Sequence, residues 1–297
     1  MGANDTGRKS GVEKEVGGVS EALERGGDMS QYTIASVSCG KDSLVIPYEY
    51  IRRGLRLDEV IMYDTGMEFQ AIYDEWAALV KLLDKNGIKH TVLKPAYNFC
   101  WQMFERPVNQ GKENEHLGYS WCGGTCRWGT ADKRTALGKY AEERGAIVLV
   151  GIAADEAHRK EKEYKPYKRF PLIDWGMAEA DCLAYCYQQG HEWRERGAAT
   201  QDGTIRLYDI LDRVSCWCCT NKNLDELRNI YHILPEYWEC LKGLQRRTCR
   251  PMKGAGKSVF DLETRFKLED ERAAAGLSTR NKEFFRELAE RLKTGRG

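Results

Sequence analysis

Long apolar stretches are missing from this chain of 297 residues, in which apolar runs extend over only a few positions. A membrane-spanning helix needs about 20 mostly apolar residues, so we expect no contact with a membrane. The first 28 residues also lack the apolar core of a secretory signal, and their many glycines predict a flexible lead-in. Together these absences favour a cytoplasmic protein.

An excess of either charge is missing as well, since 46 Lys and Arg residues stand against 45 Asp and Glu residues. This balance excludes no class of partner, because a local basic cleft can lie within a neutral total. The five histidines are scattered, without a His-x-x-His spacing or a His/Asp pair. Nucleophilic triad chemistry therefore has no support.

Cysteine is abundant, with eleven residues in the chain. An odd number without an export signal disfavours a disulfide framework. Clustered cysteines under reducing conditions are typical of metal sites or catalysis, whereas scattered ones are usually small buried side chains. The grouping of the eleven along the sequence is therefore informative.

Strand-like and helix-like segments alternate through the first half of the chain. We expect strands, from their apolar runs, at 32–38, 58–64, 88–94 and 146–151. We expect helices after residue 43 and at 69–83 and 130–145, with a loop-rich insertion at 95–128. This alternation predicts an α/β fold whose mostly parallel sheet is covered by helices on both faces. Farther along the chain, helices are expected at 178–190, 223–245 and 281–293.

Three loops follow the carboxyl ends of the expected strands, where open α/β sheets bind their ligands. They are SVSCGKDS (36–43), YDTGMEF (63–69) and GIAADEAHR (151–159). In the first loop, Gly40 lets the backbone approach a phosphate, and the amides of the following helix add donors. The hydroxyls of Ser38 and Ser43 and the charge of Lys41 also suit a phosphate. Asp42 would hold Mg²⁺ or pin the loop through backbone amides.

The other two loops supply charges to the same rim. Asp64 and Thr65 are expected to shape it near the ligand, with the alternative that Asp64 only caps its turn. Arg159 is the candidate clamp for a phosphate or sulfonate group, oriented by Glu156. The alternative for these two residues is an ordinary surface ion pair.

These loops resemble those of a known family. SVSCGKDS resembles the PP-loop, SGGxDS, of ATP pyrophosphatases and of sulfonucleotide (phosphoadenosine phosphosulfate) reductases. YDTGMEF resembles the D-T-G-x-E-F segment of the reductases, GIAADEAHR their G-x-R-x-x-E-S-x-x-R segment, and FPLIDW (170–175) their P-[LI]-x-D-W segment. The motifs follow the family order from about residue 31 to about 220. Cys39 replaces the first loop glycine of the family, and Ala153 replaces its arginine.

The resemblance implies an adenine-nucleotide alpha-hydrolase-like fold, with a flexible lead-in at 1–28, a nucleotide-binding domain at 29–215 and a helical region at 216–297. It implies catalytic roles for Lys41, Asp42 and Arg159. The nucleotide site that it implies consists of Ser38, Cys39, Gly40, Lys41, Asp42, Ser43, Asp64, Thr65, Gly66, Gly151, Glu156 and Arg159.

Four cysteines have the spacing of metal ligands. Cys122 and Cys126 form a C-x-x-x-C pair, and Cys216 and Cys219 form a C-x-x-C pair about ninety residues later. Four thiolates can hold a tetrahedral zinc or a four-iron, four-sulfur cluster. The resemblance favours the cluster, because iron–sulfur adenylylsulfate reductases carry a Cys-Cys pair and a later C-x-x-C. Cys218 is an alternative to Cys219 as the ligand.

The remaining cysteines lack this grouping. Cys182 and Cys186 lie four residues apart on one expected helix and are expected to be core residues. The rest have no partner at ligand spacing and are expected to be packing residues or free thiols: Cys100, Cys240 and Cys249.

One glycine-rich stretch resembles a nucleotide motif but does not match it. GAGKS (254–258) would be the end of a Walker A motif, yet Pro251 stands where that motif needs its first glycine. No apolar strand precedes it either, so we predict no second nucleotide site there.

The family's reductase chemistry lacks its usual cysteine in this chain. No cysteine follows Cys249, and the E-C-G-[LI]-H segment of thiol-dependent reductases is absent. The pattern is more similar to the branch that includes the DNA-phosphorothioation sulfurtransferase, which pairs a PP-loop with a cysteine-held cluster. That resemblance implies adenylation of an acceptor by ATP and Mg²⁺, pyrophosphate release and sulfur transfer. Two alternatives stay open: a reductase of adenylyl sulfate (APS) or its 3′-phosphate (PAPS), and a non-catalytic nucleotide-binding module with a structural zinc.

The partners that follow are an adenine nucleotide, a nucleic-acid or small-molecule acceptor, a sulfur donor such as a cysteine desulfurase, and a second copy of the chain in a homodimer. For a nucleic acid, Trp101, Trp121 and Trp128 would offer stacking surfaces near the first cysteine pair. The alternative for these tryptophans is burial in the core.

Overall fold

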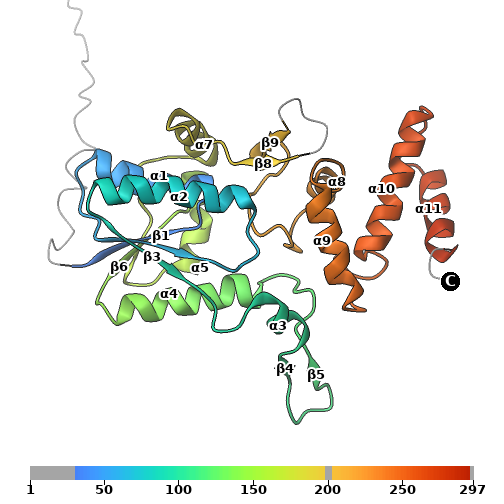
Figure 1. Ribbon diagram of the computed structural model, residues 1–297, viewed down its shortest axis with the longest axis horizontal. Coiled ribbons are helices and arrows are strands. Elements are labelled where there is room, and N and C mark those ends of the chain that lie inside the picture. Colours follow the sequence, from blue (N-terminus) through green and yellow to red (C-terminus); the bar gives the residue numbers. More distant parts are fainter. Residues whose placement is uncertain (1–30, 198–202, 295–297) are drawn as a thin grey trace, which may run out of the picture. The chain divides into compact units, whose positions relative to one another are not determined.

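A computed structural model describes residues 31–197 and 203–294 of the chain (Figure 1). The expected lead-in at 1–28 lies outside the described residues. The compact unit that holds the described part begins at Tyr32. None of the helices described is long and apolar enough to cross a membrane.

Five parallel strands form the main sheet, in the order β3-β2-β1-β6-β7. They are β1 (Thr33–Val37), β2 (Glu59–Tyr63), β3 (Lys89–Leu93), β6 (Ile147–Val150) and β7 (Lys168–Arg169). The first four confirm the predicted strands, and the two-residue β7 was not predicted. The sheet confirms the α/β class.

Helices and short elements connect and cover these strands. The helices are α1 (Lys41–Arg52), α2 (Gln70–Lys85), α3 (Phe99–Phe104), α4 (Asp132–Glu142), α5 (Lys160–Glu163), α6 (Pro171–Asp174) and α7 (Glu179–Gln188). Two small hairpins pair β4 (Pro107–Val108) with β5 (His116–Leu117) and β8 (Arg194–Arg196) with β9 (Thr204–Arg206). Three helical turns are η1 (Arg127–Ala131), η2 (Ala154–Arg159) and η3 (Leu207–Asp209). The insertion predicted as loop therefore contains α3 and a hairpin.

The central strand β1 is buried on both faces, because successive side chains of a strand point to opposite sides of the sheet. On one side Ala35 and Val37 join an apolar cluster that includes Ile72 of α2. On the other side Ile34 lies in a separate cluster with Ala141 of α4. Helices α1 and α2 thus cover one face and α4 the other (Figure 1).

The strand order reverses between β1 and β6, since the chain builds the sheet outward from β1 to β3 and then returns to the other side of β1. In an open parallel sheet, the carboxyl ends of the strands at such a reversal border the usual ligand crevice. The two loops that leave this point are 38–43, after β1, and 151–159, after β6. The topology therefore places two of the three predicted loops together.

The carboxyl-terminal part is helical, as predicted. Its helices are α8 (Leu224–Ile233), α9 (Pro235–Arg246), α10 (Val259–Ala274) and α11 (Lys282–Thr294). The single helix predicted at 223–245 is in fact two, because Leu234 leaves the helical conformation (φ −121°, ψ 59°) and Pro235 starts a new helix without needing an N–H partner. The division of the chain at residues 215 and 216 stays a prediction.

Helix α10 was not predicted, although its start carries a recognisable signal. Ser258 accepts a hydrogen bond from the amide of Asp261, and the Asp261 carboxylate accepts one from the Ser258 amide. This reciprocal pair is a capping box. Buried apolar side chains of the helix, Val259 and Leu262 among them, join the main core.

Replacing the cap residue should destabilise the fold measurably. We expect Ser258→Ala to lower the free energy of unfolding by about 1 kcal/mol, because two amides at the start of α10 lose their partner or its alignment. Thr264→Ala, in the same helix, is the control, because its hydroxyl bonds only the Phe260 carbonyl of the preceding turn. Urea unfolding measures both variants, and equal losses would contradict a capping role.

Candidate functional site

The loop between β1 and α1 is held closed by its own side chains. The amide of Ser38 donates to Ser43 Oγ at 3.0 Å, and the two serine hydroxyl oxygens lie 3.1 Å apart. Ser43 Oγ also donates to the Gly40 carbonyl at 3.2 Å. Both hydroxyls predicted to bind phosphate are therefore bonded to each other in this state.

Cys39 occupies a backbone conformation that usually belongs to glycine. Its φ is 54°, in the left-handed region, where a Cβ is unfavourable. The Trp193 indole N–H donates to the Cys39 carbonyl at 2.6 Å and helps to hold this conformation. The thiol is fully buried, and this burial raises its pKa far above the usual range. Cys39 therefore keeps the backbone shape of the family's glycine without offering a reactive thiolate.

The start of α1 has a partner that the sequence did not suggest. The amide of Lys41 donates to the Tyr208 hydroxyl at 2.8 Å, so a tyrosine from η3 occupies the first amide of the helix. A Cβ placed on Gly40 would come within 3.4 Å of the same hydroxyl oxygen. Gly40 thus leaves room for both Tyr208 and the loop.

Lys41 is a buried ammonium held by two carboxylates. Its Nζ donates to Glu179 Oε2 at 2.6 Å and lies 3.4 Å from Asp42 Oδ1. Burial opposes the charge of Lys41, but the hydrogen bond to Glu179 and the charge of Asp42 outweigh it and raise its pKa. The lysine is therefore charged, and its ammonium faces two carboxylates.

Asp42 is the member of this group whose negative charge is opposed by burial. Burial raises its pKa to about 6; the charge of Lys41 opposes this shift and the charge of Glu179 reinforces it. Among the described residues, Oδ1 of Asp42 is buried and accepts no hydrogen bond, although the Lys41 ammonium lies 3.4 Å away. An acidic oxygen of this kind, beside a phosphate loop, suits a cation such as Mg²⁺.

The loop after β6 touches the loop after β1. A Cβ on Gly151 would lie 2.7 Å from Ser43 Cα and 2.8 Å from Ser43 N, closer than real contacts allow. Only glycine therefore permits this approach. Ala153, which stands where the family has arginine, is fully buried.

The predicted clamp residue makes an ion pair. Arg159 donates to Glu156, which also accepts from Arg213. Arg213, in turn, lies 3.8 Å from Glu179. Arg159 is 41% exposed and Arg213 is 61% exposed, so both guanidinium groups face solvent at the rim. The pair fits the ion-pair alternative, and the clamp role of Arg159 stays a prediction.

In the loop after β2, Asp64 and Thr65 face different partners. Asp64 Oδ1 accepts from the Gly66 amide at 2.7 Å and from the Tyr73 hydroxyl at 2.8 Å, so it caps the turn. Gly66 takes a φ of 75° in this turn. Thr65 instead donates to Glu68 Oε1 at 2.9 Å and borders a cavity.

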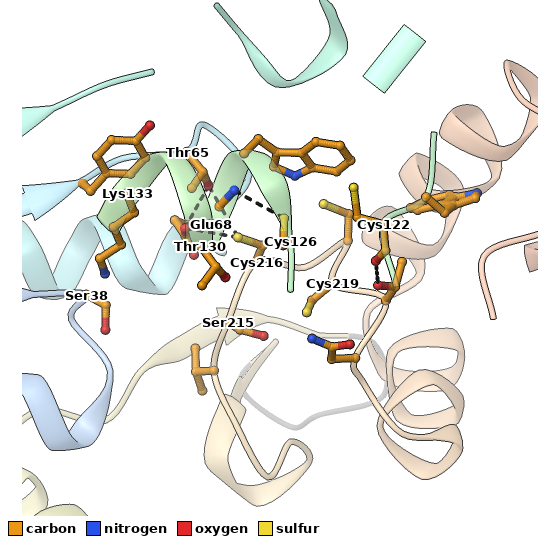
Figure 2. A pocket seen from close by; sticks show the side chains of 18 of the residues that line it. Ser38, Thr65, Glu68, Cys122, Cys126, Thr130, Lys133, Ser215, Cys216 and Cys219 are labelled. Carbon is orange, nitrogen blue, oxygen red and sulfur yellow. Dashed lines mark hydrogen bonds between the residues drawn. The ribbon is translucent and has the colours of Figure 1, made fainter. Parts of the chain in front are cut away.

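That cavity brings the two predicted sites together (Figure 2). It has a volume of about 220 Å³, and Ser38 of the first loop lines it, as do side chains of the β2 loop. Its thiols are Cys122, Cys126, Cys216, Cys218 and Cys219. The structure therefore places all four predicted metal ligands, and the alternative Cys218, in one cavity that reaches the nucleotide loop.

The thiols line the cavity but do not converge on one point. In the part of the chain that is described, no three His, Cys, Asp or Glu side chains are gathered as they would be around an ion. Burial raises the pKa of Cys122 and Cys126, and that of Cys216 and Cys218 well above the usual value. The donor set, five thiols that line one cavity, fits a thiolate-held centre, and binding would draw the sulfurs together. It does not choose between Cys218 and Cys219.

Two further cavity residues were not assigned a role from the sequence. Glu68 belongs to the quoted YDTGMEF motif, and its Oε1 accepts from Thr65 and, at 3.3 Å, from Cys216 Sγ. Lys133, at the start of α4, has no hydrogen-bond or ion-pair partner among the described residues. Burial lowers the pKa of Lys133, against the opposing charge of Glu68. The position of Lys133 a few residues after the first cysteine pair was the only feature of the sequence that could have indicated its place in the cavity.

Two lysines form hydrogen bonds with the backbone around the second cysteine loop, which carries Cys216, Cys218 and Cys219. Lys222 is 2% exposed, and its Nζ donates to the Arg213 carbonyl at 3.4 Å. Lys253 Nζ donates to the carbonyls of Thr220 and Lys222 at 2.6 and 2.8 Å. Because these ammonium groups hold backbone oxygens, they fix the loop that carries three of the five thiols. No motif indicated them.

The other predictions on cysteine and tryptophan are settled by burial. Cys182 and Cys186 are buried, which confirms them as core residues, whereas Cys100, Cys240 and Cys249 are exposed. Trp121 and Trp128 are 2% and 8% exposed and pack in the core, so they offer no open stacking surface. Trp101 is only partly buried and stacks on Tyr97, with ring centroids 4.1 Å apart.

The raised pKa of Asp42 predicts a pH-dependent gain from Asp42→Asn. The folded state holds this proton up to about pH 6, whereas an unfolded aspartate loses it near 4. The wild type therefore loses stability as the pH rises through this window, and the asparagine variant does not. We expect Asp42→Asn to be nearly as stable as wild type at pH 4 and more stable by about 2 kcal/mol at pH 7. Urea unfolding at pH 4, 5.5 and 7 measures the difference in unfolding free energy between variant and wild type. A difference that does not change with pH would contradict a raised pKa of Asp42.

The contact between the β1 and β6 loops predicts a sharp cost for Gly151→Ala. We expect a loss of about 1–3 kcal/mol in unfolding free energy, because the new methyl group meets backbone atoms that cannot move aside. The control is Gly243→Ala, in the interior of α9, where a Cβ meets nothing within 4 Å. That variant should gain up to about 1 kcal/mol. Thermal or urea unfolding compares the two, and a neutral Gly151→Ala would refute the close contact.

Comparisons with known proteins were made with family models, curated sequences and solved structures. No protein-family model and no curated protein matches the chain. Among solved structures, the chain is similar to the U34-tRNA thiolase NcsA from Methanococcus maripaludis with its [4Fe-4S] cluster. The TM-score is 0.37 and the identity 16%, over 85% of this chain and 74% of that chain. A likeness of this size establishes neither a family nor an activity.

Proposed function

We propose that this protein is a PP-loop ATP pyrophosphatase of the phosphoadenosine phosphosulfate reductase family that activates an acceptor with ATP and transfers sulfur to it. One observation carries the proposal: a single cavity is lined both by Ser38 of the nucleotide loop and by five cysteine thiols. Nucleotide chemistry and sulfur chemistry therefore share one space. The reductase alternative is disfavoured because no cysteine follows Cys249 and the E-C-G-[LI]-H segment of thiol-dependent reductases is absent.

The residues of the first loop would bind the phosphates of ATP. Lys41 would move its ammonium from Glu179 to a phosphate, and Ser38 and Ser43 would exchange their mutual hydrogen bond for phosphate oxygens. Mg²⁺ held near Asp42 would offset the negative charge that Asp42, Glu156 and Glu179 add to that of the triphosphate.

The proposed reaction has two displacements. An acceptor oxygen attacks the α-phosphorus of ATP, the bond from phosphorus to the bridging oxygen breaks, and pyrophosphate leaves with the electron pair. Sulfide then attacks the carbon that carries the adenylated oxygen, so that a C–S bond forms, the C–O bond breaks and AMP leaves. Neither displacement changes an oxidation state, so no oxidant or reductant is required.

The cavity side chains have separate tasks in this scheme. Cys122, Cys126, Cys216 and either Cys218 or Cys219 would hold a four-iron, four-sulfur centre that ties the two cysteine loops together. A binding place for sulfur on such a centre would require only three of these thiols as ligands, so that one iron stays open. Lys133 would place its positive charge beside the adenylated intermediate. Glu68, which already accepts from Cys216 and Thr65, would orient that wall of the cavity.

The test begins with anaerobically purified full-length protein. We expect about four irons and four sulfides per chain by chemical analysis, with loss of most iron in Cys216→Ser. Cys240→Ser is the control, because that thiol is exposed on α9 and does not line the cavity. Pyrophosphate release from ATP should require an acceptor, and Lys41→Ala should weaken ATP binding at least about tenfold, the loss of one charged contact.

Different results would support the other functions. One zinc, no iron and ATP binding without pyrophosphate release would make the protein a non-catalytic nucleotide-binding module. Tighter binding of APS or PAPS than of ATP, with sulfite released by a thiol, would make it a sulfonucleotide reductase. Either result overturns the sulfurtransferase proposal.

A further inference from the structure

The segment 246–257, which joins α9 to α10, is the most one-sided stretch of charge near the cavity. Its basic residues are Arg246, Arg247, Arg250, Lys253 and Lys257, and it contains no Asp or Glu. In a chain with a net charge of only +1, such a segment needs an explanation. This segment lies beyond the part of the chain in which the family motifs occur.

Hydrogen bonds tie this segment to both cysteine loops. Thr248 Oγ1 lies 2.6 Å from Ser120 Oγ, next to the first cysteine pair. Lys253 donates to the carbonyl of Thr220, which lines the cavity beside the second. Arg127 directly follows Cys126 in the sequence, and the amide of Arg250 donates to the same Thr248 hydroxyl at 3.2 Å. The basic segment therefore runs along the edge of the thiol cavity.

Aromatic rings alternate with these arginines. The guanidinium groups of Arg106 and Arg127 lie 5.2 and 5.1 Å from the centroid of the Tyr119 ring, and that of Arg247 lies 3.9 Å from the Phe104 ring. On the same helix as Phe104, Trp101 stacks on Tyr97, which is 55% exposed. We name Arg106, Arg127, Arg247 and Arg250 the basic rim.

The rim has fewer carboxylate partners than other arginine clusters of the described residues. On α8 and α10, for example, Arg228 and Arg265 both donate to Glu269. Within the described residues, Arg127 and Arg250 have no ion pair, and Arg106 bonds only a neutral amide oxygen. Arg247 reaches one carboxylate, Glu105, at 3.7 Å. Three of the four rim guanidinium groups therefore have no carboxylate partner among the described residues.

We propose that the basic rim binds the phosphate backbone of a single-stranded nucleic acid and presents one of its nucleotides to the thiol cavity. Guanidinium groups match phosphate oxygens in pairs, and exposed rings such as Tyr97 stack on unpaired bases. A cavity of about 220 Å³ admits one small group, so the strand must deliver a single unstacked nucleotide. The inference rests on the proposed function for the chemistry in the cavity, and it names the acceptor of that reaction.

Binding of fluorescent 20-nucleotide strands to the full-length protein tests the rim. Anisotropy is measured with RNA and with single-stranded DNA of the same sequence, from 50 to 300 mM salt. We expect Arg127→Gln/Arg250→Gln to weaken binding at least tenfold and to lower the slope of log K against log salt by about 1.4, two phosphate contacts' worth. The stronger of the two strands identifies the natural substrate class.

Two controls separate a nucleic-acid surface from a merely positive one. Lys81→Gln/Lys85→Gln removes the same charge from the exposed side of α2 and should change affinity less than twofold. Tyr97→Ala should lower the affinity for both strands at least fivefold. It should leave the affinity for inorganic polyphosphate, which has no bases, unchanged.

Several results would overturn the inference. One is that the wild type binds neither strand at 50 mM salt, and another is that the rim and α2 variants lose equal affinity. A third is that the protein binds polyphosphate, an acidic polypeptide or anionic lipid vesicles more tightly than either strand. ATP binding and pyrophosphate release are measured on the same samples. If strands bind through the rim but ATP is not used, the proposed function fails and the rim stands; if ATP is used but strands do not bind, the rim fails alone.

Discussion

The structure depends first on the burial of β1 at the centre of the parallel sheet. This strand pairs with β2 on one side and with β6 on the other, and apolar clusters cover both its faces. Parallel pairing keeps the ends of the three strands in step, because Val37 pairs with Met62 and Ser36 pairs with Val150. The loops that leave these ends therefore start at one level, and the candidate site is a consequence of the register.

Charge at this edge is arranged in opposed pairs. Lys41 lies between Glu179 and Asp42, while Glu156 lies between Arg159 and Arg213. The loop hydroxyls satisfy each other in the same way. The groups of such a site satisfy one another without a ligand, and each of these bonds involves a group of a type that also binds phosphate or metal. Ligand binding then becomes an exchange of partners within a fixed backbone.

The sequence predicted the sheet and its loops well, because both depend on local patterns. Alternating apolar segments located β1, β2, β3 and β6, and small polar motifs marked the turns after them. It missed α10, although Ser258 and Asp261 have the capping-box spacing. A capping box that is not followed by a long apolar run was too weak a signal to predict a helix there.

The composition of the site was harder to predict, since it depends on contacts between distant segments. The cysteine pairs were recognisable by their spacing. That they line the same cavity as Ser38 follows only from the tertiary fold. Tyr208, Trp193, Lys222 and Lys253 act through one or two hydrogen bonds to backbone groups. A single residue that bonds a backbone atom leaves no periodic trace in a sequence.

The anchoring of the second cysteine loop by Lys253 has a mechanical consequence. Lys253 lies three residues after Arg250, and its ammonium holds the carbonyls of Thr220 and Lys222. A force on the basic segment is therefore transmitted to the loop of Cys216, Cys218 and Cys219, and the reverse also holds. By thermodynamic reciprocity, any change that loading of the thiols makes in the affinity of that segment for its ligand is matched by an equal change in the affinity of the thiols for theirs. Lys253 is then the contact through which such a coupling would pass.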